Sequence, residues 1–228
     1  MAPFSNELGF GYKNRDVLFF FGTGTATLEK LKSKFSELSF FEIRQTHSAL
    51  VIEATKTYTE ADAHFSAKKN AALLIKTADC MPLMIHCLQT RRVAAVHAGW
   101  RGVENRITRS TIQNLIATGS TDCNFDIFVG PSIQQKSFEV DRDVFEKLIS
   151  AQTDHLPDFD LAATYFQEND KFYIDLNALV QQQISVCTDS KARVTFSKAD
   201  TKTSLDFHSY RRGKSPSERN LSFVCLLT

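Results

Sequence analysis

The feature that most constrains the fold of this chain is a series of short apolar runs, each ended by turn residues or charges. Several of them, such as VLFFF and AALLIK, are apolar almost throughout, which is typical of strands buried on both faces. None approaches the ~18 residues of a membrane-spanning segment. We expect β-strands at 17–21, 40–46, 49–54, 71–76, 82–87, 92–97, 125–130, 193–196 and 221–227.

Three further segments carry apolar residues at helical spacing. The first is expected to stop at Gly119, the second covers 144–149, and the third starts at Asp175, whose side chain can cap a first turn. Their apolar faces are Val103, Ile107, Ile112, Leu115 and Ile116; Val144, Phe145, Leu148 and Ile149; and Leu176, Leu179, Val180, Ile184 and Cys187. This order predicts an α/β fold (an α+β layered sandwich), a single domain over 1–228 with mixed buried β-sheets flanked by helices.

Charge and cysteine content exclude several classes of protein. The 228 residues carry a formal net charge of +1, and the basic pairs Arg91-Arg92 and Arg211-Arg212 are too short to form a basic stripe, so we expect no nucleic-acid partner. The charged N-terminus is a poor signal peptide, and we expect no membrane partner. Five cysteines without a C-x-x-C pair favour free thiols, so a cytoplasmic location is expected.

Three side chains suited to metal binding follow predicted strands. His47 follows 40–46, Cys80 follows 71–76 by a few residues, and His97 ends 92–97. Two imidazoles and a thiolate can hold a tetrahedral zinc and leave its fourth position open. A cysteine beside an apolar run is more often a core residue, and a loop histidine is more often solvated. Spacing alone therefore leaves both interpretations open.

Longer segments around these residues carry a family resemblance. They are RQTHSALV (44–51), TADCMPLMI (77–85) and AAVHAGWRG (94–102), joined by ADA (61–63), GPSIQQKSFEV (130–140) and FHSYRR (207–212). In this order they resemble the multicopper polyphenol oxidase (laccase)-domain family, whose members are now described as zinc-dependent purine nucleoside phosphorylases. The resemblance implies that His47, Cys80 and His97 bind the metal and are the catalytic residues.

The resemblance also implies the reaction. Phosphate would cleave adenosine, inosine or a related purine nucleoside to free base and ribose-1-phosphate, so a nucleoside and phosphate are the expected partners of a monomer or homodimer. Some family members deaminate adenosine, for which zinc can activate a water, or cleave methylthioadenosine. For the phosphate, Arg101 and Arg211 or Arg212 are candidates, because a guanidinium suits bidentate contacts. Arg44 would face either the substrate or the solvent.

Two neighbours of the ligands have open roles. Asp79 would orient a metal ligand or bond to its own turn, and Trp100 would stack on a base or pack in the core. The chain departs from the family pattern at Ser48, in place of a glycine, and at 21–27, where an expected arginine is absent. It also departs at 213–219, which carries Glu218 before Arg219, and Cys187-Thr188 lies far upstream of the Cys-Thr pair expected near the last motif. These changes predict a shifted nucleoside preference.

Two other functions remain open at this stage. A copper oxidase would use Cys80, the histidines and Met81 or Met84, and copper can also occupy a zinc site as an adventitious or alternative metal. Multicopper oxidation needs a further imidazole cluster, however, and the other histidines are scattered: His64, His86, His155 and His208. A thiol hydrolase would use Cys80 and His97, since the family fold resembles a cysteine-dependent deamidase toxin; family members are also linked to editing of peptidoglycan precursors. A non-enzymatic binding role is the remaining alternative.

Overall fold

The computed structural model describes residues 1–116, 123–156 and 158–228. Its first sheet contains β1 (Ala2–Asn6), β2 (Gly9–Lys13), β3 (Val17–Gly22), β15 (Asn220–Leu226), β7 (Ala71–Thr77) and β4 (Ser39–Phe41), in that order. Its second sheet contains β14 (Ala192–Phe196), β10 (Phe125–Val129), β8 (Met81–Cys87), β9 (Arg92–Ala98), β6 (Ala63–Ser66) and β5 (Val51–Glu53). Most neighbouring strands are antiparallel; β4–β7, β5–β6 and β10–β14 are parallel.

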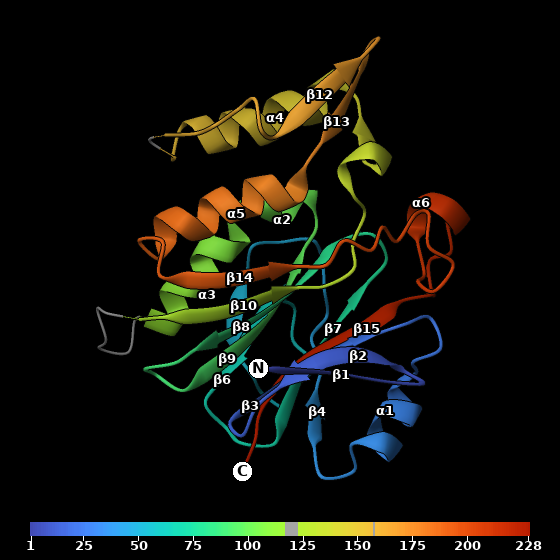
Figure 1. Cartoon of the computed structure of the whole chain (residues 1–228), viewed down its shortest axis with the longest axis vertical. Coiled ribbons are helices and arrows are strands. Elements are labelled where there is room, and N and C mark those ends of the chain that lie inside the picture. Colours follow the sequence, from blue (N-terminus) through green and yellow to red (C-terminus); the bar gives the residue numbers. More distant parts are fainter. Residues whose placement is uncertain (117–122, 157) are drawn as a thin grey trace.

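A third, smaller sheet and the helices complete the structure. The sheet orders β11 (Glu139–Val140), β13 (Lys171–Ile174) and β12 (Tyr165–Glu168). The helices are α1 (Leu28–Lys34), α2 (Trp100–Glu104), α3 (Ile107–Ile116), α4 (Arg142–Thr153), α5 (Leu176–Cys187) and α6 (Tyr210–Gly213), with a 3-10 turn η1 (Gln135–Ser137). Figure 1 shows α2, α3 and α5 stacked beside the second sheet, and α4 lying beyond them next to the small sheet.

The two large sheets pack face to face. Phe19 and Phe21 of β3 meet Met84 of β8 and Phe128 of β10 in one buried cluster between the sheets. The alternate residues of β3, such as Phe20, face the other way and pack with α1. Those of β8 and β10, such as Leu83 and Ile127, pack with the helices on the far side of the second sheet. The sheets are therefore buried on both faces, which is why their strands are continuous apolar runs. The predicted α/β class of layered, mixed sheets flanked by helices is confirmed.

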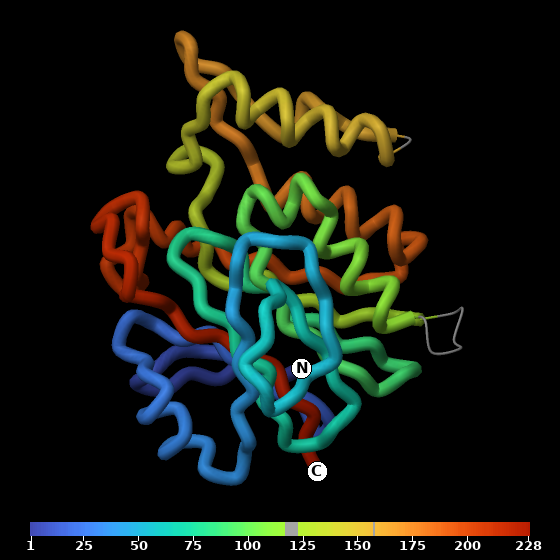
Figure 2. The backbone as a smooth tube through the Cα atoms, turned by 180° about the vertical axis from the view of Figure 1, so that it is seen from behind, coloured from blue at the N-terminus to red at the C-terminus, as the bar shows by residue number. Residues whose placement is uncertain are grey.

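All nine predicted strands are present, but two are much shorter than predicted. The run 40–46 is a strand only at Ser39–Phe41, and the run 49–54 only at Val51–Glu53. Between them Arg44 forms an isolated β-bridge with Glu60, and the Asp62 carboxylate accepts the N–H groups of residues 46 to 48. In Figure 2 this segment is the light-blue part of the tube, on the side facing the viewer.

The helix predictions were correct in position but wrong in one boundary. Asp175 caps α5, because its carboxylate accepts the N–H of Ala178. The first predicted helix is two helices, since Arg106 has a left-handed backbone (φ 59°) between α2 and α3. The predicted stop at Gly119 lies outside the described residues. The sequence analysis did not predict six strands of the described ranges, whose patterns are short or half-exposed: β1, β2, β6, β11, β12 and β13. It also did not predict the short helices α1 and α6.

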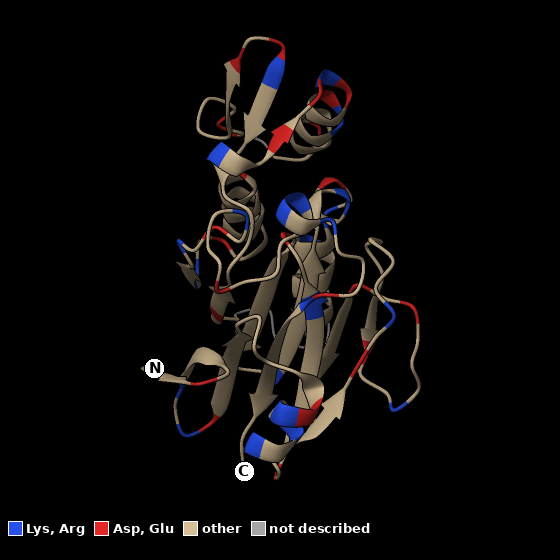
Figure 3. Cartoon of the chain, turned by 90° about the vertical axis from the view of Figure 1, so that its right-hand side faces the viewer, with Lys and Arg blue, Asp and Glu red and all other residues tan. Residues whose placement is uncertain are grey.

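Three general features of the chain concern its helices, its surface charges and its cysteines. No helix in the described ranges is both long and apolar enough to cross a membrane. Lys and Arg alternate with Asp and Glu over the face drawn in Figure 3. The five cysteines are all free thiols.

His64 should make the fold sensitive to acid. It is 1% exposed on β6, and burial lowers its pKa to about 3, against a smaller opposing effect of a backbone hydrogen bond to Leu74. An unfolded histidine binds a proton near pH 6.5, so the stability contributed by neutral His64 is present above that pH and is lost as the pH falls towards 3.

Because of His64, we expect the free energy of unfolding to decrease by about 2 kcal/mol when the pH is lowered from 8 to 5. Urea unfolding of wild type and His64→Leu at several pH values checks this. The difference between the two proteins should change with pH below 6.5 and stay constant above pH 7.5. A pH-independent difference would contradict the prediction.

Candidate functional site

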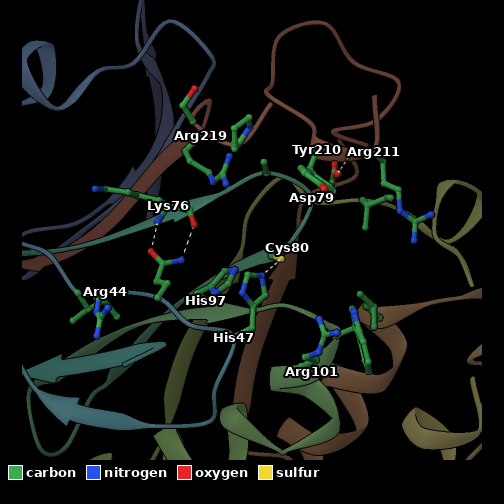
Figure 4. Close-up of a pocket in the computed structure, with 18 of the residues that line it drawn as sticks. Arg44, His47, Lys76, Asp79, Cys80, His97, Arg101, Tyr210, Arg211 and Arg219 are labelled. Carbon is green, nitrogen blue, oxygen red and sulfur yellow. Dashed lines mark hydrogen bonds between the residues drawn. The ribbon is translucent and has the colours of Figure 1, made fainter. Parts of the chain in front are cut away.

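The three predicted metal ligands meet at one point. His47 lies in the segment between β4 and β5, Cys80 in the turn between β7 and β8, and His97 near the end of β9 (Figure 4). Their ligand atoms all lie within 4.8 Å of one another. The His47 and His97 rings are edge to face with centroids 4.8 Å apart, and His47 Nε2 lies 4.0 Å from Cys80 Sγ.

Asp62 holds two of these ligands in place. Its carboxylate is fully buried, and its Oδ1 accepts hydrogen bonds from His97 Nδ1 at 2.7 Å and from His47 N at 3.0 Å. Its Oδ2 accepts from Ser48 N at 2.6 Å and from Ser48 Oγ at 2.7 Å. Since Nδ1 of His97 is bonded to a carboxylate, Nε2 is left to face the other ligands. Sequence reasoning missed Asp62, although it lies within the family-like segment ADA.

His47 is not at the end of a strand, contrary to the sequence-based expectation. The strand before it ends at Phe41, and His47 itself has a left-handed backbone (φ 60°). Such a conformation is uncommon for a residue with a side chain and persists where the surroundings impose it. Here the imposing group is Asp62, which binds the peptide N–H groups on both sides of His47.

Asp79 shapes the turn that carries Cys80. It has φ 84°, its Oδ1 accepts from Thr201 Oγ1 at 2.7 Å, and its Oδ2 accepts from Arg211 N at 2.7 Å. The carboxylate therefore ties the Cys80 turn to Thr201 and to the first turn of α6, and it makes no hydrogen bond to His47, Cys80 or His97. Neither predicted role, orienting a ligand or bonding to its own turn, matches these contacts, which join the turn to a distant segment of the chain.

The charges at the site favour an ionised thiol. Burial alone would raise the pKa of Cys80, but the positive charge of His97 and hydrogen bonds from His47 and His97 outweigh it and lower this pKa to about 6. Burial would likewise lower the pKa of His97, but Cys80 and Asp62 raise it to about 9. The carboxyl pKa of Asp62 falls to about 2 because hydrogen bonds from His97 and Ser48 outweigh its burial.

The donor set fits a metal ion. A thiolate and two imidazoles are ligands that zinc and copper both accept. In a tetrahedral zinc site the ligand atoms lie roughly 3.3–3.8 Å apart, so only a small closure of the observed group would be needed. Gly99 leaves the necessary room, because a Cβ there would lie 3.0 Å from Cys80 Sγ and 3.2 Å from His47 Cδ2.

Gly99→Ala should weaken metal binding without harming the fold. The backbone of Gly99 is extended (φ −72°, ψ 168°), a conformation open to alanine, so the added methyl acts only on the two ligands. We expect metal affinity to fall by about tenfold, the size of effect produced by displaced neighbours of metal ligands. Gly213→Ala is the control, since its Cβ would meet nothing within 4 Å. Equal affinities in a competitive chelator titration would contradict the prediction.

A pocket of about 600 Å³ opens beside the three ligands. Its walls combine aromatic and cationic side chains, as Figure 4 shows. They include Tyr58, Trp100, Phe138, Tyr210, Arg44, Lys76, Arg101, Arg211 and Arg219. A pocket of this size suits a small organic substrate.

All three predicted substrate arginines line this pocket, but their surroundings differ. Arg44 is in an ion pair with Glu60. Arg101 lies over the Trp100 ring at 4.4 Å, and Trp100 in turn packs against the core. Arg211 lies 5.4 Å over Phe138 and donates to the Glu139 carbonyl at 2.9 Å.

Arg212, the other candidate in the same motif, does not line the pocket. Its guanidinium donates to the carbonyls of Thr201, Lys202, Ser204 and Phe207, so it is used to hold the 201–207 segment together. Two further pocket cations, Lys76 and Arg219, were missed by sequence reasoning. Lys76 pairs with Glu42 at 2.7 Å, and Arg219 donates to backbone carbonyls of its own loop.

The departures from the family pattern fall in different places. Pro216, Ser217 and Arg219 line the pocket, so the changes at 213–219 affect it directly. The segment 21–27 does not line it; Gly24 packs on Asp206 and His208. Ser48, in place of glycine, adds a hydroxyl hydrogen bond to the Asp62 carboxylate.

The fold and site together define an α/β protein of packed mixed sheets with a His–Cys–His group beside a cationic pocket. Residues 25–227 match the model of the family described as multi-copper polyphenol oxidoreductase laccase, and the chain belongs to this family. The family predicted from the Cys80 and His97 segments is therefore confirmed.

Several relatives carry the name purine nucleoside phosphorylase. One from Rickettsia prowazekii is 28% identical over 163 residues, which cover 70% of this chain and 65% of that protein. YfiH of Escherichia coli is 28% identical over 192 residues, covering 81% of this chain and 73% of its own length. A Synechocystis relative is 33% identical over 111 residues, but these are only 42% of its length. The chain thus spans less than two thirds of two of these three proteins.

Solved structures share the fold. A Neisseria meningitidis protein superposes with a TM-score of 0.79 at 23% identity, covering 94% of this chain and 96% of the other. The hypothetical protein YfiH of Bacillus licheniformis gives a TM-score of 0.80 at 18% identity, covering 93% of both chains.

Proposed function

We propose that the chain is a zinc-dependent purine nucleoside phosphorylase that uses phosphate to cleave adenosine or inosine to free base and ribose-1-phosphate. The observation that carries the proposal is the convergence of His47, Cys80 and His97 within 4.8 Å beside a pocket lined by aromatic and cationic groups. The names of the relatives support the same activity.

The chain's own residues prepare the metal site. Zinc held by His47, Cys80 and His97 would supply Lewis-acid chemistry beside the pocket. Asp62 fixes the orientation of the His97 ring and holds the His47 loop. Copper would also bind these ligands, so the metal of a purified sample reflects its exposure to copper.

Arg101 and Arg211 are the proposed phosphate contacts. Each lines the pocket and stacks on an aromatic ring, which holds the guanidinium in place. Neither is in an ion pair within the described ranges, so both charges remain available to an anion. Arg44 is already paired with Glu60 and is the weaker candidate for substrate binding.

Phosphorolysis fits this pocket better than deamination. Zinc deaminases use a carboxylate near the metal as general acid and base. Among the described residues that line the pocket, Asp79 is the single carboxylate, and both of its oxygens accept hydrogen bonds from the protein. We therefore propose that adenosine deamination is a secondary activity of the same site. Methylthioadenosine cleavage, which is itself a phosphorolysis, is a further proposed activity.

A thiol hydrolase is the second candidate, and one observation favours it. Cys80, His97 and Asp62 form a thiol–imidazole–carboxylate series in which Asp62 binds Nδ1 of His97. The lowered pKa of Cys80, about 6, would give it a nucleophilic thiolate at neutral pH. An editing activity on peptidoglycan precursors would fall under this candidate.

A copper oxidase is disfavoured by the remaining histidines. His64 and His86 are buried in separate strands, and neither belongs to a group of convergent ligands in the part of the chain that the structure describes. A multicopper cluster would require several imidazoles at one place.

Adenosine incubated with zinc-loaded, copper-free protein should give adenine only when phosphate is present. Chromatography of reactions with and without phosphate measures this, and inosine or hypoxanthine would reveal deamination. Arg101→Gln should raise the KM for phosphate about tenfold, as expected for loss of a charge-assisted contact.

Arg142→Gln is the control, because this exposed arginine pairs with Glu146 on α4, away from the pocket lining. A folded, metal-loaded protein that converts no purine nucleoside under either condition would exclude the proposed function.

A further inference from the structure

A second hollow lies on the helical side of the molecule, where the start of α3 meets the ends of α4 and α5. Its outer part, about 420 Å³, is lined by Asn105, Arg106, Arg109, Ser110, Gln113 and His155. None of these residues lines the pocket beside the metal ligands. In Figure 1 the ends of α4 and α5 lie at the left, whereas α6, which borders that pocket, lies at the right.

The hollow is lined by two arginines, Arg106 and Arg109, whose positive charges are not paired within the described ranges. Arg106 and Arg109 are both half-buried, and His155 adds a third nitrogen-bearing side chain from beyond α4. Neither guanidinium has a hydrogen-bond or ion-pair partner in the described parts of the chain. Two guanidinium groups so placed can bind an oxyanion from two directions.

A buried acceptor lies at the inner end of this hollow. Gln183 is 2% exposed and lines the inner part together with Arg106, Arg109 and His155. Its Nε2 donates to Val103 O at 2.9 Å and to Gln152 Oε1 at 2.7 Å, but its Oε1 has no partner. The inner space is about 10 Å³, enough for roughly one hydroxyl or water. An unpaired buried acceptor favours a ligand that brings a donor.

The backbone at Arg106 gives an independent indication. Its φ of 59° is left-handed, a conformation that glycine adopts without cost and that arginine does not. This residue forms the break between α2 and α3, where a glycine would serve the fold better. A strained residue that presents an unpaired charge to a hollow is typical of a binding site.

We propose that this hollow binds a small phosphate-type anion that also carries a hydroxyl donor, either inorganic phosphate or a phosphate monoester. Arg106 and Arg109 would contact the anionic oxygens, and Gln183 Oε1 would accept from the hydroxyl. Sulfate has the same shape and carries charge but no donor at neutral pH, so the site should discriminate against it. The proposal is independent of the reaction in the pocket beside His47, Cys80 and His97.

Calorimetric titration of the zinc-loaded full chain, at constant ionic strength, tests the proposal with phosphate, sulfate and ribose 5-phosphate. Wild type should bind phosphate in this hollow. The affinity for phosphate in the hollow should be at least about tenfold lower in Arg106→Gly and in Arg109→Gln. Arg106→Gly should fold well, because glycine relieves the left-handed backbone. Its adenosine turnover should stay unchanged.

Arg91→Gly is the matched control, since Arg91 is also left-handed (φ 51°) but lies elsewhere on the surface. It should bind phosphate as wild type does. Tighter binding of ribose 5-phosphate than of phosphate would identify an ester as the ligand, and the reverse would identify inorganic phosphate. Equal phosphate binding by wild type, Arg106→Gly and Arg109→Gln, or equal binding of sulfate and phosphate at this site, would overturn the proposal.

Discussion

Cys80→Ala should abolish both metal binding and turnover. Removing the thiolate leaves two imidazoles, a much weaker site, so we expect metal affinity to fall by at least about a thousandfold. The same residue should show a metal-dependent reaction with iodoacetamide. In metal-free protein its pKa of about 6 makes it a thiolate at neutral pH, whereas a bound metal would occupy the sulfur and protect it.

Two further variants make this test specific. Cys187→Ala is the control, because Cys187 is half-buried like Cys80 but is not among the convergent ligands. Cys80→Asp should keep part of the zinc and part of the activity, since a carboxylate can bind zinc but cannot act as a thiol nucleophile. A metal-free enzyme that is inactivated by iodoacetamide, with an acyl-thioester trapped on Cys80 during turnover, would establish the thiol hydrolase in its place.

Asp62→Asn should damage both the fold and the metal site. The carboxylate accepts hydrogen bonds from Ser48, His47 and His97, and an amide would turn a donor towards at least one of these donors. We expect a loss of roughly 2–4 kcal/mol of unfolding free energy, from a buried network with one partner removed. Metal affinity should fall by roughly 10- to 100-fold, because His97 loses the group that orients it.

The control for Asp62 is Asp126→Asn. Asp126 of β10 is also buried, at 5% exposure, and its Oδ1 accepts a hydrogen bond from Nε of Arg193 on β14 at 2.7 Å. Neither residue belongs to the group of convergent metal ligands. This variant should lose stability without losing metal affinity. Chemical unfolding and chelator titration measure the two quantities separately. If Asp62→Asn and Asp126→Asn bind metal equally well, Asp62 does not orient the site.

The strands were predictable because their cause is local. A run such as VLFFF is apolar almost throughout only when both of its faces are covered, and β3 lies between two buried clusters. The same holds for the cap of α5, where Asp175 bonds to a residue three positions away. Cys80 and His97 were singled out because each lies at or near the end of a predicted strand, but this position left a core role open, and the family resemblance favoured the metal-binding one.

Other features depend on contacts between distant parts of the chain. Asp62 lies 15 residues from His47 and 35 from His97, and nothing in its own segment shows that its carboxylate binds both. Arg211 and Arg212 are adjacent, yet only the tertiary structure shows that one faces the pocket and the other holds a loop. Local sequence thus determined the strands, the capped helix and the residues that could bind a metal. Only the packing of remote segments decided which polar side chains are bonded within the protein and which remain free for a ligand.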